Sequence, residues 1–216
     1  MTNRLSDPAA QPALSAENED VAQLQRALIG DEQAFDLLYA RRAGVVYQFA
    51  LRMSGSVTLA EDVTQDVFIA LLRSGQKFDP ARGTLPQYLL GMTRNRVLTL
   101  LQRERNFVPL AVDEGEEGRA ALERGTAPAV PQDDPLFDLT RAERVEAVRQ
   151  AVLALPVHYR EVVVLCNLDE LSYEQAAQLL GCPVGTVRSR LNRARALLLE
   201  KLQTHQAVAQ RTMAVL

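Results

Sequence analysis

The sequence predicts an all-α protein of two small helical domains joined by a flexible acidic linker, with a helix-turn-helix in the C-terminal domain. Apolar residues recur at helical spacing on both sides of residues 106–135. Only 5% of the 216 residues are aromatic and tryptophan is absent, which suits helices packed through Leu, Ala and Val. Residues 106–135 hold seven acids, three glycines and four prolines without apolar periodicity, so they are typical of a tether between domains.

The N-terminal part is predicted to contain a disordered tail, residues 1–20, and a helical domain, residues 21–105. The tail has two prolines and many small or polar residues. Gly30, Gly55 and the loop 75–83 divide the helical domain into its helices. Helices are expected from about residue 18–20 to Ile29, from Glu32 to Ser54, from Thr58 to Ser74 and from Leu85 to Arg105.

Acidic and amide side chains gather near the start of the third of these helices, at Glu61, Asp62, Gln65 and Asp66. Stabilisation of the helix N-terminus explains this cluster sufficiently, because the helix dipole favours negative charge there. Paired carboxylates can also bind a metal or act in acid–base catalysis. That interpretation is disfavoured here, since no histidine, nucleophile or glycine-rich loop accompanies them.

The fourth helix and the loop before it form a basic surface. Five arginines stand against a single acid, Glu104, between residues 82 and 105. These are Arg82, Arg94, Arg96, Arg103 and Arg105. Arginines beside aromatic rings and an asparagine suit phosphates and unstacked bases, and Phe78, Tyr88 and Asn95 supply them here. An ordinary solvated helix with unconnected arginines remains the alternative.

The C-terminal domain is predicted over residues 136–204, followed by a weakly patterned tail, residues 205–216. Its first helix is expected from Leu136 to Leu153 and its second from His158 to Leu165. The expected inward positions of the first helix are Leu139, Val145, Val148 and Val152.

Residues 171–202 have the pattern of a helix-turn-helix. Ser172 and Gln175 form a predicted capping box, Gly181 can adopt the left-handed conformation that ends a helix, and Pro183 fits the start of the next. The buried stripe of the second helix is predicted to be Val187, Leu191, Ala194 and Leu198. Its outward face is then Gly185, Ser189, Asn192 and Ala196, flanked by Arg188 and Arg193. Such a face suits duplex DNA, with a solvated helical hairpin as the alternative.

Composition excludes several classes of protein. No apolar run is long enough to cross a membrane, and the N-terminus lacks the apolar core of a secretory signal. Cys166 and Cys182 have no CxxC spacing, and only two histidines exist, so no structural zinc and no cofactor is expected. The two thiols are expected to be packing residues in a reducing cytoplasm.

Three stretches together resemble a bacterial RNA polymerase sigma factor of the extracytoplasmic-function (ECF) group, in the sigma-70 family. They are AEDVTQDVFIALL (60–72), FDPARGTLPQYLLGMTRNRVLTLLQRER (78–105) and LPVHYREVVVLCNLDELSYEQAAQLLGCPVGTVRSRLNRARALL (155–198). With the first helices, the resemblance covers most of residues 21–105 and 136–203. Few helix-turn-helix proteins carry all three stretches in this order and spacing.

The resemblance implies a role for each stretch. The first docks on the clamp of core RNA polymerase, through Asp62, Gln65 and Asp66. The second reads and melts the minus-ten promoter element, through Lys77, Phe78, Arg82, Tyr88, Asn95, Arg96 and Arg103. The third reads the minus-thirty-five element, through Thr186, Arg188, Ser189, Asn192 and Arg193. An anti-sigma partner is also implied.

The sequence departs from the family pattern at three positions. Tyr88 stands where the family usually has Trp, so base stacking is expected to be weaker. Thr99 replaces a usual Asp and is given no role. Pro183 replaces the usual Ser N-cap of the recognition helix, so the capping hydrogen bond is lost.

The resulting prediction is a cytoplasmic, non-enzymatic subunit that directs core RNA polymerase to promoter DNA, helps open it and does not insert into membranes. One alternative function is that of a DNA-binding regulator that acts on a palindromic site without polymerase. The two unlike basic surfaces disfavour this alternative. A second rival is a nucleic-acid enzyme with Asp62 and Asp66 as metal ligands, which the lack of further convergent ligands disfavours.

Overall fold

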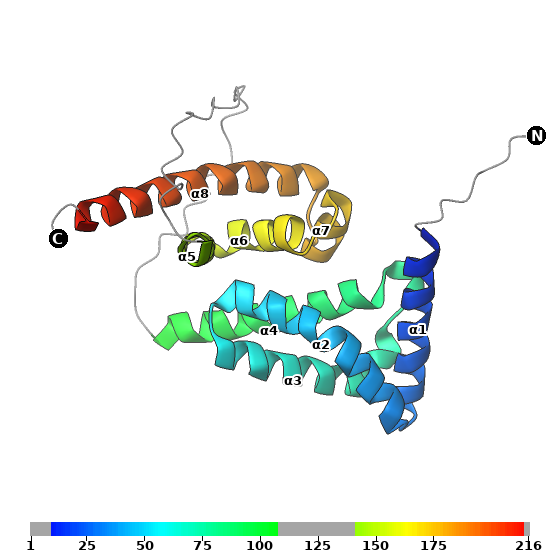
Figure 1. Ribbon diagram of the computed structural model, residues 1–216. Coiled ribbons are helices and arrows are strands. Elements are labelled where there is room, and N and C mark those ends of the chain that lie inside the picture. Colours follow the sequence, from blue (N-terminus) through cyan, green and yellow to red (C-terminus); the bar gives the residue numbers. More distant parts are fainter. Residues whose placement is uncertain (1–9, 108–140, 214–216) are drawn as a thin grey trace, which may run out of the picture.

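The computed structural model describes residues 10–107 and 141–213, with side chains placed over 18–103 and 141–203. Within these ranges the regular structure is entirely helical, as predicted. Figure 1 shows α1–α4 in one layer and α5–α8 in a second layer beside it. The two layers contact each other directly, mainly through α2 with α5 and α4 with α7.

The N-terminal layer contains α1 (Ala10–Leu28), α2 (Glu32–Ser54), α3 (Val57–Ser74) and α4 (Leu85–Phe107). Two short 3₁₀ turns, η1 (Gly75–Lys77) and η2 (Pro80–Arg82), lie within the segment predicted to be a loop. Helix α2 is central, because it packs against α1, α3 and α4. The largest fully buried side chains here include Phe49, Phe68 and Leu89, one from each of α2, α3 and α4.

Local sequence explains where these helices begin and end. The carboxylate of Asp31 accepts from the Ala34 amide at 3.0 Å, and the hydroxyl of Ser56 accepts from the Leu59 amide at 3.2 Å. Gly55 ends α2 in the left-handed region at φ 73°. The predicted bounds of α2 are therefore confirmed, and α3 begins one residue earlier than predicted.

The prediction of a disordered tail through residue 20 is wrong for residues 10–20, which belong to α1. Ala, Gln, Leu and Glu favour the helix, and Pro12 lies in its first turn, where proline is tolerated. The side chain of Asp20 is fully buried and accepts from the guanidiniums of Arg41 and Arg42 on α2. Pairing of this buried carboxylate ties α1 to α2. Residues 1–9 lie outside the described ranges.

The C-terminal layer contains α5 (Arg141–Leu153), α6 (Val157–Val163), the π-helical segment η4 (Val164–Leu168), α7 (Tyr173–Leu180) and α8 (Val184–Met213). Its core is formed by Val162, Val164 and Leu165 against Val187, Leu191 and Ala194 of α8. The predicted stripe of α8 is thus confirmed for three positions, while Leu198 is half-buried.

The helix-turn-helix has the predicted local chemistry. The hydroxyl of Ser172 accepts from the Gln175 amide at 3.2 Å, and the Gln175 side chain accepts from the Ser172 amide at 2.8 Å. Gly181 adopts the left-handed conformation at φ 65°. The carbonyl of Pro183 accepts from the amides of Thr186 and Val187, so Pro183 opens α8 without a side-chain cap.

Several predictions about the C-terminal half are wrong. Val145 and Val148 are 63% and 44% exposed, because α5 is buried through its last turns, at Ala151 and Val152. The helix predicted from His158 to Leu165 changes to π-helix at Val164. Helix α8 continues to Met213, so the predicted tail from residue 205 is largely helical. In the predicted linker, Asn106 and Phe107 end α4, and residues 108–135 lie outside the described ranges, as do 136–140.

Candidate nucleic-acid interface

The segment between α3 and α4 is held in a defined conformation. The carboxylate of Asp79 accepts from the Ala81 amide at 3.0 Å and so begins η2. Thr84 and Gln87 cap the start of α4 reciprocally, since the side chain of each accepts from the backbone amide of the other. This Thr-x-x-Gln pair is readable in the sequence, although it was not among the predicted features. The segment therefore presents its side chains from a fixed backbone.

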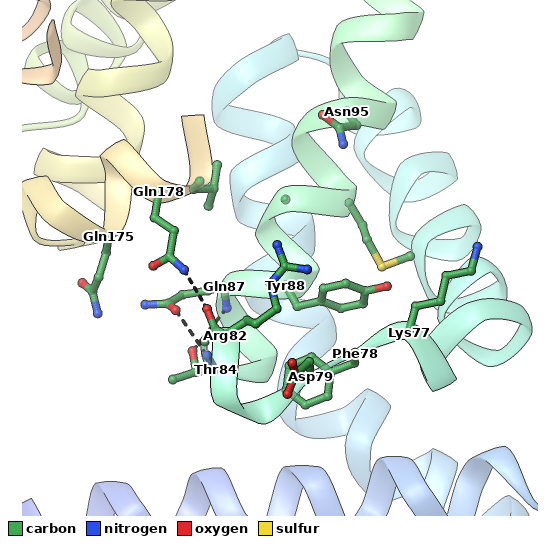
Figure 2. A pocket seen from close by; sticks show the side chains of 14 residues that line it. Lys77, Phe78, Asp79, Arg82, Thr84, Gln87, Tyr88, Asn95, Gln175 and Gln178 are labelled. Atoms are coloured by element: carbon green, nitrogen blue, oxygen red, sulfur yellow. Dashed lines mark hydrogen bonds between the residues drawn. The ribbon is translucent and has the colours of Figure 1, made fainter. Parts of the chain in front are cut away.

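A cavity of about 570 Å³ lies against this segment, and Figure 2 shows its lining side chains. It gathers five of the seven residues predicted to read the minus-ten element, namely Lys77, Phe78, Arg82, Tyr88 and Asn95. The rings of Phe78 and Tyr88 lie 5.4 Å apart at 53°, so they form one aromatic surface. Lys77 and Arg82 are exposed beside these rings. The site combines an aromatic platform, two cations and an amide, which together suit a nucleobase with its phosphates.

The other two predicted minus-ten residues lie outside the cavity lining. Arg96 donates from Nε to a carboxylate oxygen of Asp66 on α3 at 2.8 Å. Arg103 is exposed farther along α4. The structure thus separates Arg96 and Arg103 from the aromatic platform.

The opposite wall of the cavity comes from α7 of the C-terminal layer, through Gln175, Gln178 and Leu179. The Nε2 atom of Gln178 donates to the carbonyl of Arg82 at 2.6 Å (Figure 2). These residues were not predicted to belong to this site. No local sequence signal indicates them, because their placement depends on how the two layers meet.

Charged groups pair across the boundary between the layers. Arg94 on α4 donates to Glu161 on α6 at 2.6 Å, and Glu161 is almost fully buried. Arg52 on α2 pairs with Asp169 and also donates to the carbonyl of Leu168. Burial raises the pKa of the Asp169 carboxyl to about 6, and the neighbouring Arg52 opposes that shift.

Helix α8 presents the predicted DNA-reading face to solvent. Arg188, Ser189, Asn192 and Arg193 are exposed, and Thr186 is half-buried. A Cβ atom added at Gly185 would meet nothing within 4 Å, so this part of the helix surface is open. The hydroxyl of Ser189 donates to the carbonyl of Thr186 at 3.1 Å. The arrangement can contact phosphates through arginine and base edges through arginine, serine and asparagine.

Helix α3 presents the predicted polymerase-contacting residues on its outer face. Asp62 and Gln65 are exposed, and Asp66 is half-buried against Arg96. Ile69 and Leu72 are 47% and 40% exposed on the same helix.

Among the described residues, no group of three or more His, Cys, Asp or Glu side chains is placed to hold a metal ion. No described helix is both long and apolar enough to cross a membrane.

Comparison with known proteins assigns both layers to one family. Residues 38–107 match the family model for sigma-70 region 2, and residues 145–198 match the model for sigma-70 region 4. The ECF RNA polymerase sigma factor SigW of Bacillus subtilis is 31% identical over 175 residues, which cover 81% of this chain and 91% of SigW. The chain belongs to the ECF RNA polymerase sigma factors. Its function is promoter-specific initiation of transcription with RNA polymerase.

This sigma factor is also similar to a second ECF sigma factor and to a solved structure. The ECF sigma factor SigE of Mycolicibacterium smegmatis is 36% identical over 183 residues, which span 82% of this chain but 66% of SigE. Among solved structures, CnrH in complex with the cytosolic domain of CnrY matches with a TM-score of 0.60 and 26% identity, covering 86% of this chain and 98% of CnrH. The resemblance drawn from the sequence motifs is therefore confirmed.

Proposed function

We propose that the two layers of this sigma factor divide the promoter between them, residues 21–105 acting on the minus-ten element and residues 136–204 on the minus-thirty-five element. The observation that carries this proposal is the cavity that gathers Lys77, Phe78, Arg82, Tyr88 and Asn95. A base taken out of the DNA stack costs a few kcal/mol, which contacts in a pocket must offset. An aromatic pair beside two cations supplies stacking and phosphate contacts together.

The outer face of α8 is the proposed minus-thirty-five contact, through Thr186, Arg188, Ser189, Asn192 and Arg193. Arg193 and Arg188 suit phosphates or guanine edges, and Asn192 suits adenine. A tether between the two surfaces, over residues 106–135, lets each add to the affinity of the other once both are held on one polymerase.

The outer face of α3 is the proposed docking surface for the clamp of core RNA polymerase, through Asp62, Gln65 and Asp66. In this role the chain carries no chemistry of its own and works in the cytoplasm, where polymerase meets the promoter. The solved complex of CnrH with the cytosolic domain of CnrY supports the further proposal that an anti-sigma factor binds this chain.

Transcription assays with purified core polymerase test whether the two layers act on separate promoter elements. Arg188→Ala should weaken promoters that depend on the upstream element, by roughly 5- to 150-fold for the loss of one base or phosphate contact of about 1–3 kcal/mol. Binding to core polymerase should be unchanged. Arg190→Ala is the matched control, because Arg190 lies on the same helix but is half-buried, toward His158.

Two outcomes contradict the proposal. If core polymerase gains no promoter selectivity from the chain, the division of the promoter is wrong. If Arg188→Ala releases the chain from polymerase, the outer face of α8 contacts protein instead of DNA.

A further inference from the structure

Helix α1 lies against the start of the segment that joins α3 to α4. Figure 1 shows α1 running across the end of the N-terminal layer at which this segment lies, and α1 contacts α3, η1 and α4 there. The stretch that matches sigma-70 region 2 begins at residue 38, so α1 lies outside it. None of the residues proposed above to contact DNA or polymerase lies in α1.

The contact between α1 and this segment centres on Gly75, the first residue of η1. Gly75 is buried, and a Cβ atom there would lie 3.1 Å from a methyl carbon of Leu28 and 3.3 Å from a methyl carbon of Leu24. Leu24 is 2% exposed and Leu28 is half-buried. The two leucines therefore come close to the backbone of the segment, and the lack of a side chain at Gly75 allows this approach.

Gly75 is linked in turn to the aromatic rings of the cavity. Its carbonyl accepts from the Phe78 amide at 3.0 Å, and its own amide donates to the carbonyl of Leu71 on α3. The ring of Phe78 lies 5.4 Å from that of Tyr88. One continuous series of contacts thus runs from Leu28 through Gly75 and Phe78 to Tyr88.

Helix α1 is itself fixed at both ends. The side chain of Asp20 is fully buried, and its carboxylate accepts from Arg41 at 3.2 Å and from Arg42 at 2.6 Å. Near the other end, Arg26 donates at 2.9 Å to Asp31, the residue that caps α2. Moving α1 would leave the buried carboxylate of Asp20 without its partners, which costs free energy. The leucines of α1 are therefore held in position against η1.

We propose that α1 positions the segment that reads the minus-ten element, with Leu24 and Leu28 as positioning residues that hold Phe78 beside Tyr88 through Gly75. The inference rests on the proposed capture of a base in the cavity. Side chains that are ordered before binding save the free energy of ordering them when the base arrives. Loss of this positioning should lower promoter opening and leave binding to core polymerase unchanged.

Substitution of Leu28 tests the positioning role. Holoenzyme is assembled from core polymerase and the full chain, on a promoter that the wild-type holoenzyme selects from a library of random DNA. Leu28→Ala removes the methyl groups near Gly75 and should lower the fraction of open promoter, measured by permanganate reactivity, by roughly 2- to 30-fold. Leu28→Met nearly conserves the side-chain volume and should retain opening. If Leu28→Ala does not fold by circular dichroism, Leu28→Val takes its place.

A matched variant separates positioning from a general loss of stability. Val46→Ala shortens a fully buried side chain of α2, in the same layer. It should lower the urea midpoint of unfolding at least as much as Leu28→Ala, because Leu28 is only half-buried. At a temperature at which both variants are folded, Val46→Ala should leave the fraction of open promoter unchanged.

Gly75 offers a compensating change. Gly75→Ala places a methyl group closer to Leu24 and Leu28 than side chains usually pack, and it should lower opening. Gly44→Ala is the matched control, because a Cβ atom at this position of α2 would meet nothing within 4 Å. The double variant Gly75→Ala/Leu28→Ala should open more promoter than either single variant, since the new methyl group occupies part of the space that Leu28 loses.

Tyr88→Ala in the same assay separates failure of the positioning role from failure of the proposed function. If Tyr88→Ala leaves opening unchanged, the cavity does not capture the base and both proposals are wrong. If Tyr88→Ala lowers opening but Leu28→Ala does not, only the positioning by α1 is wrong. An equal loss with Val46→Ala would also overturn the positioning role. Losses with Leu28→Ala and Gly75→Ala that the double variant relieves would support it.

Discussion

Arg96 on α4 donates a hydrogen bond to Asp66 on α3, with 2.8 Å between Nε and the carboxylate oxygen. The pair joins a residue proposed to contact minus-ten DNA to one proposed to contact polymerase. The two side chains are 40% and 41% exposed, so the pair is expected to contribute only about 0–1 kcal/mol to folding. Its main effect is therefore on orientation, since each side chain fixes the position of the other at the surface.

A double-mutant cycle tests this coupling. Arg96→Ala and Asp66→Ala should each weaken binding to core polymerase, and together they should cost less than the sum of the two losses, with an interaction free energy of about 0.5–1 kcal/mol. Surface plasmon resonance with immobilised core polymerase measures the four affinities. Asp62→Ala is the control, because its exposed side chain lies outside the pair and should add to Arg96→Ala independently. Additivity in both cycles would show that the pair has no role in docking.

Two glycines in the helix-turn-helix should respond oppositely to the same substitution. A Cβ atom would meet nothing within 4 Å at either Gly181 or Gly185, but only Gly181 has a positive φ, 65°. Gly181→Ala should therefore destabilise the protein by about 1–2 kcal/mol through backbone strain. Gly185→Ala lies within a helix and should be neutral or stabilising by up to about 1 kcal/mol. Urea denaturation followed by circular dichroism measures both, and equal losses would contradict this account.

Asp169 should make the stability of the protein depend on pH between about 4 and 6, and Asp169→Asn should remove this dependence. Burial raises its pKa from 3.8 to about 6 despite the neighbouring Arg52, so the folded state favours the protonated carboxyl. Its contribution is fully present below pH 3.8 and is lost as the pH rises through about 6. Relative to Asp169→Asn, the wild-type protein should gain thermal stability as the pH falls from about 6 to 4.

The quantity to measure is the difference between the melting temperatures of the wild-type protein and of Asp169→Asn. Other carboxylates change the stability of both proteins with pH in the opposite direction. Arg149 lowers the pKa of Glu146 to about 2, so that group contributes stability that is lost on acidification below its usual pKa. Arg52→Gln should move the Asp169 window to higher pH, since Arg52 lowers this pKa. A window that stayed in place or moved down would show that Arg52 does not lower the pKa of Asp169.

Local chemistry explains which features could be predicted from the sequence. Ser172, Gln175 and Gly181 act within one turn of where they stand, so their capping roles were predictable. The stripe from Val187 to Ala194 was predictable because a helix buries residues at regular spacing. The same reasoning failed for Val145, which is exposed because the buried residues of α5, Ala151 and Val152, lie near its end.

The contacts between the layers could not be predicted in this way. Arg160, Glu161 and Asp169 have no local signal that distinguishes them from solvated charges, and their partners Met53, Arg94 and Arg52 lie 107, 67 and 117 positions away in the chain. Arginines near aromatic residues already indicated Phe78, Arg82, Tyr88 and Asn95 in the sequence, and the resemblance to a family added Lys77. Their convergence with Gln178 of α7 required the fold.

Tyr88 offers a gain-of-function prediction for promoter opening. Its ring packs 5.4 Å from Phe78 and lines the cavity, where the family usually has the larger indole of Trp. Stacking of a base on an aromatic side chain contributes about 1–3 kcal/mol. Tyr88→Ala should therefore reduce open complexes by roughly 5- to 150-fold, and Tyr88→Trp should increase them by a few-fold. Permanganate reactivity of unpaired thymines around the start site measures the fraction of open promoter.

Tyr39→Trp is the control, because Tyr39 packs on Phe35 and Phe68 away from the cavity and should leave that fraction unchanged. Equal opening by wild type and Tyr88→Ala, with polymerase binding intact, would show that the flipped base stacks elsewhere.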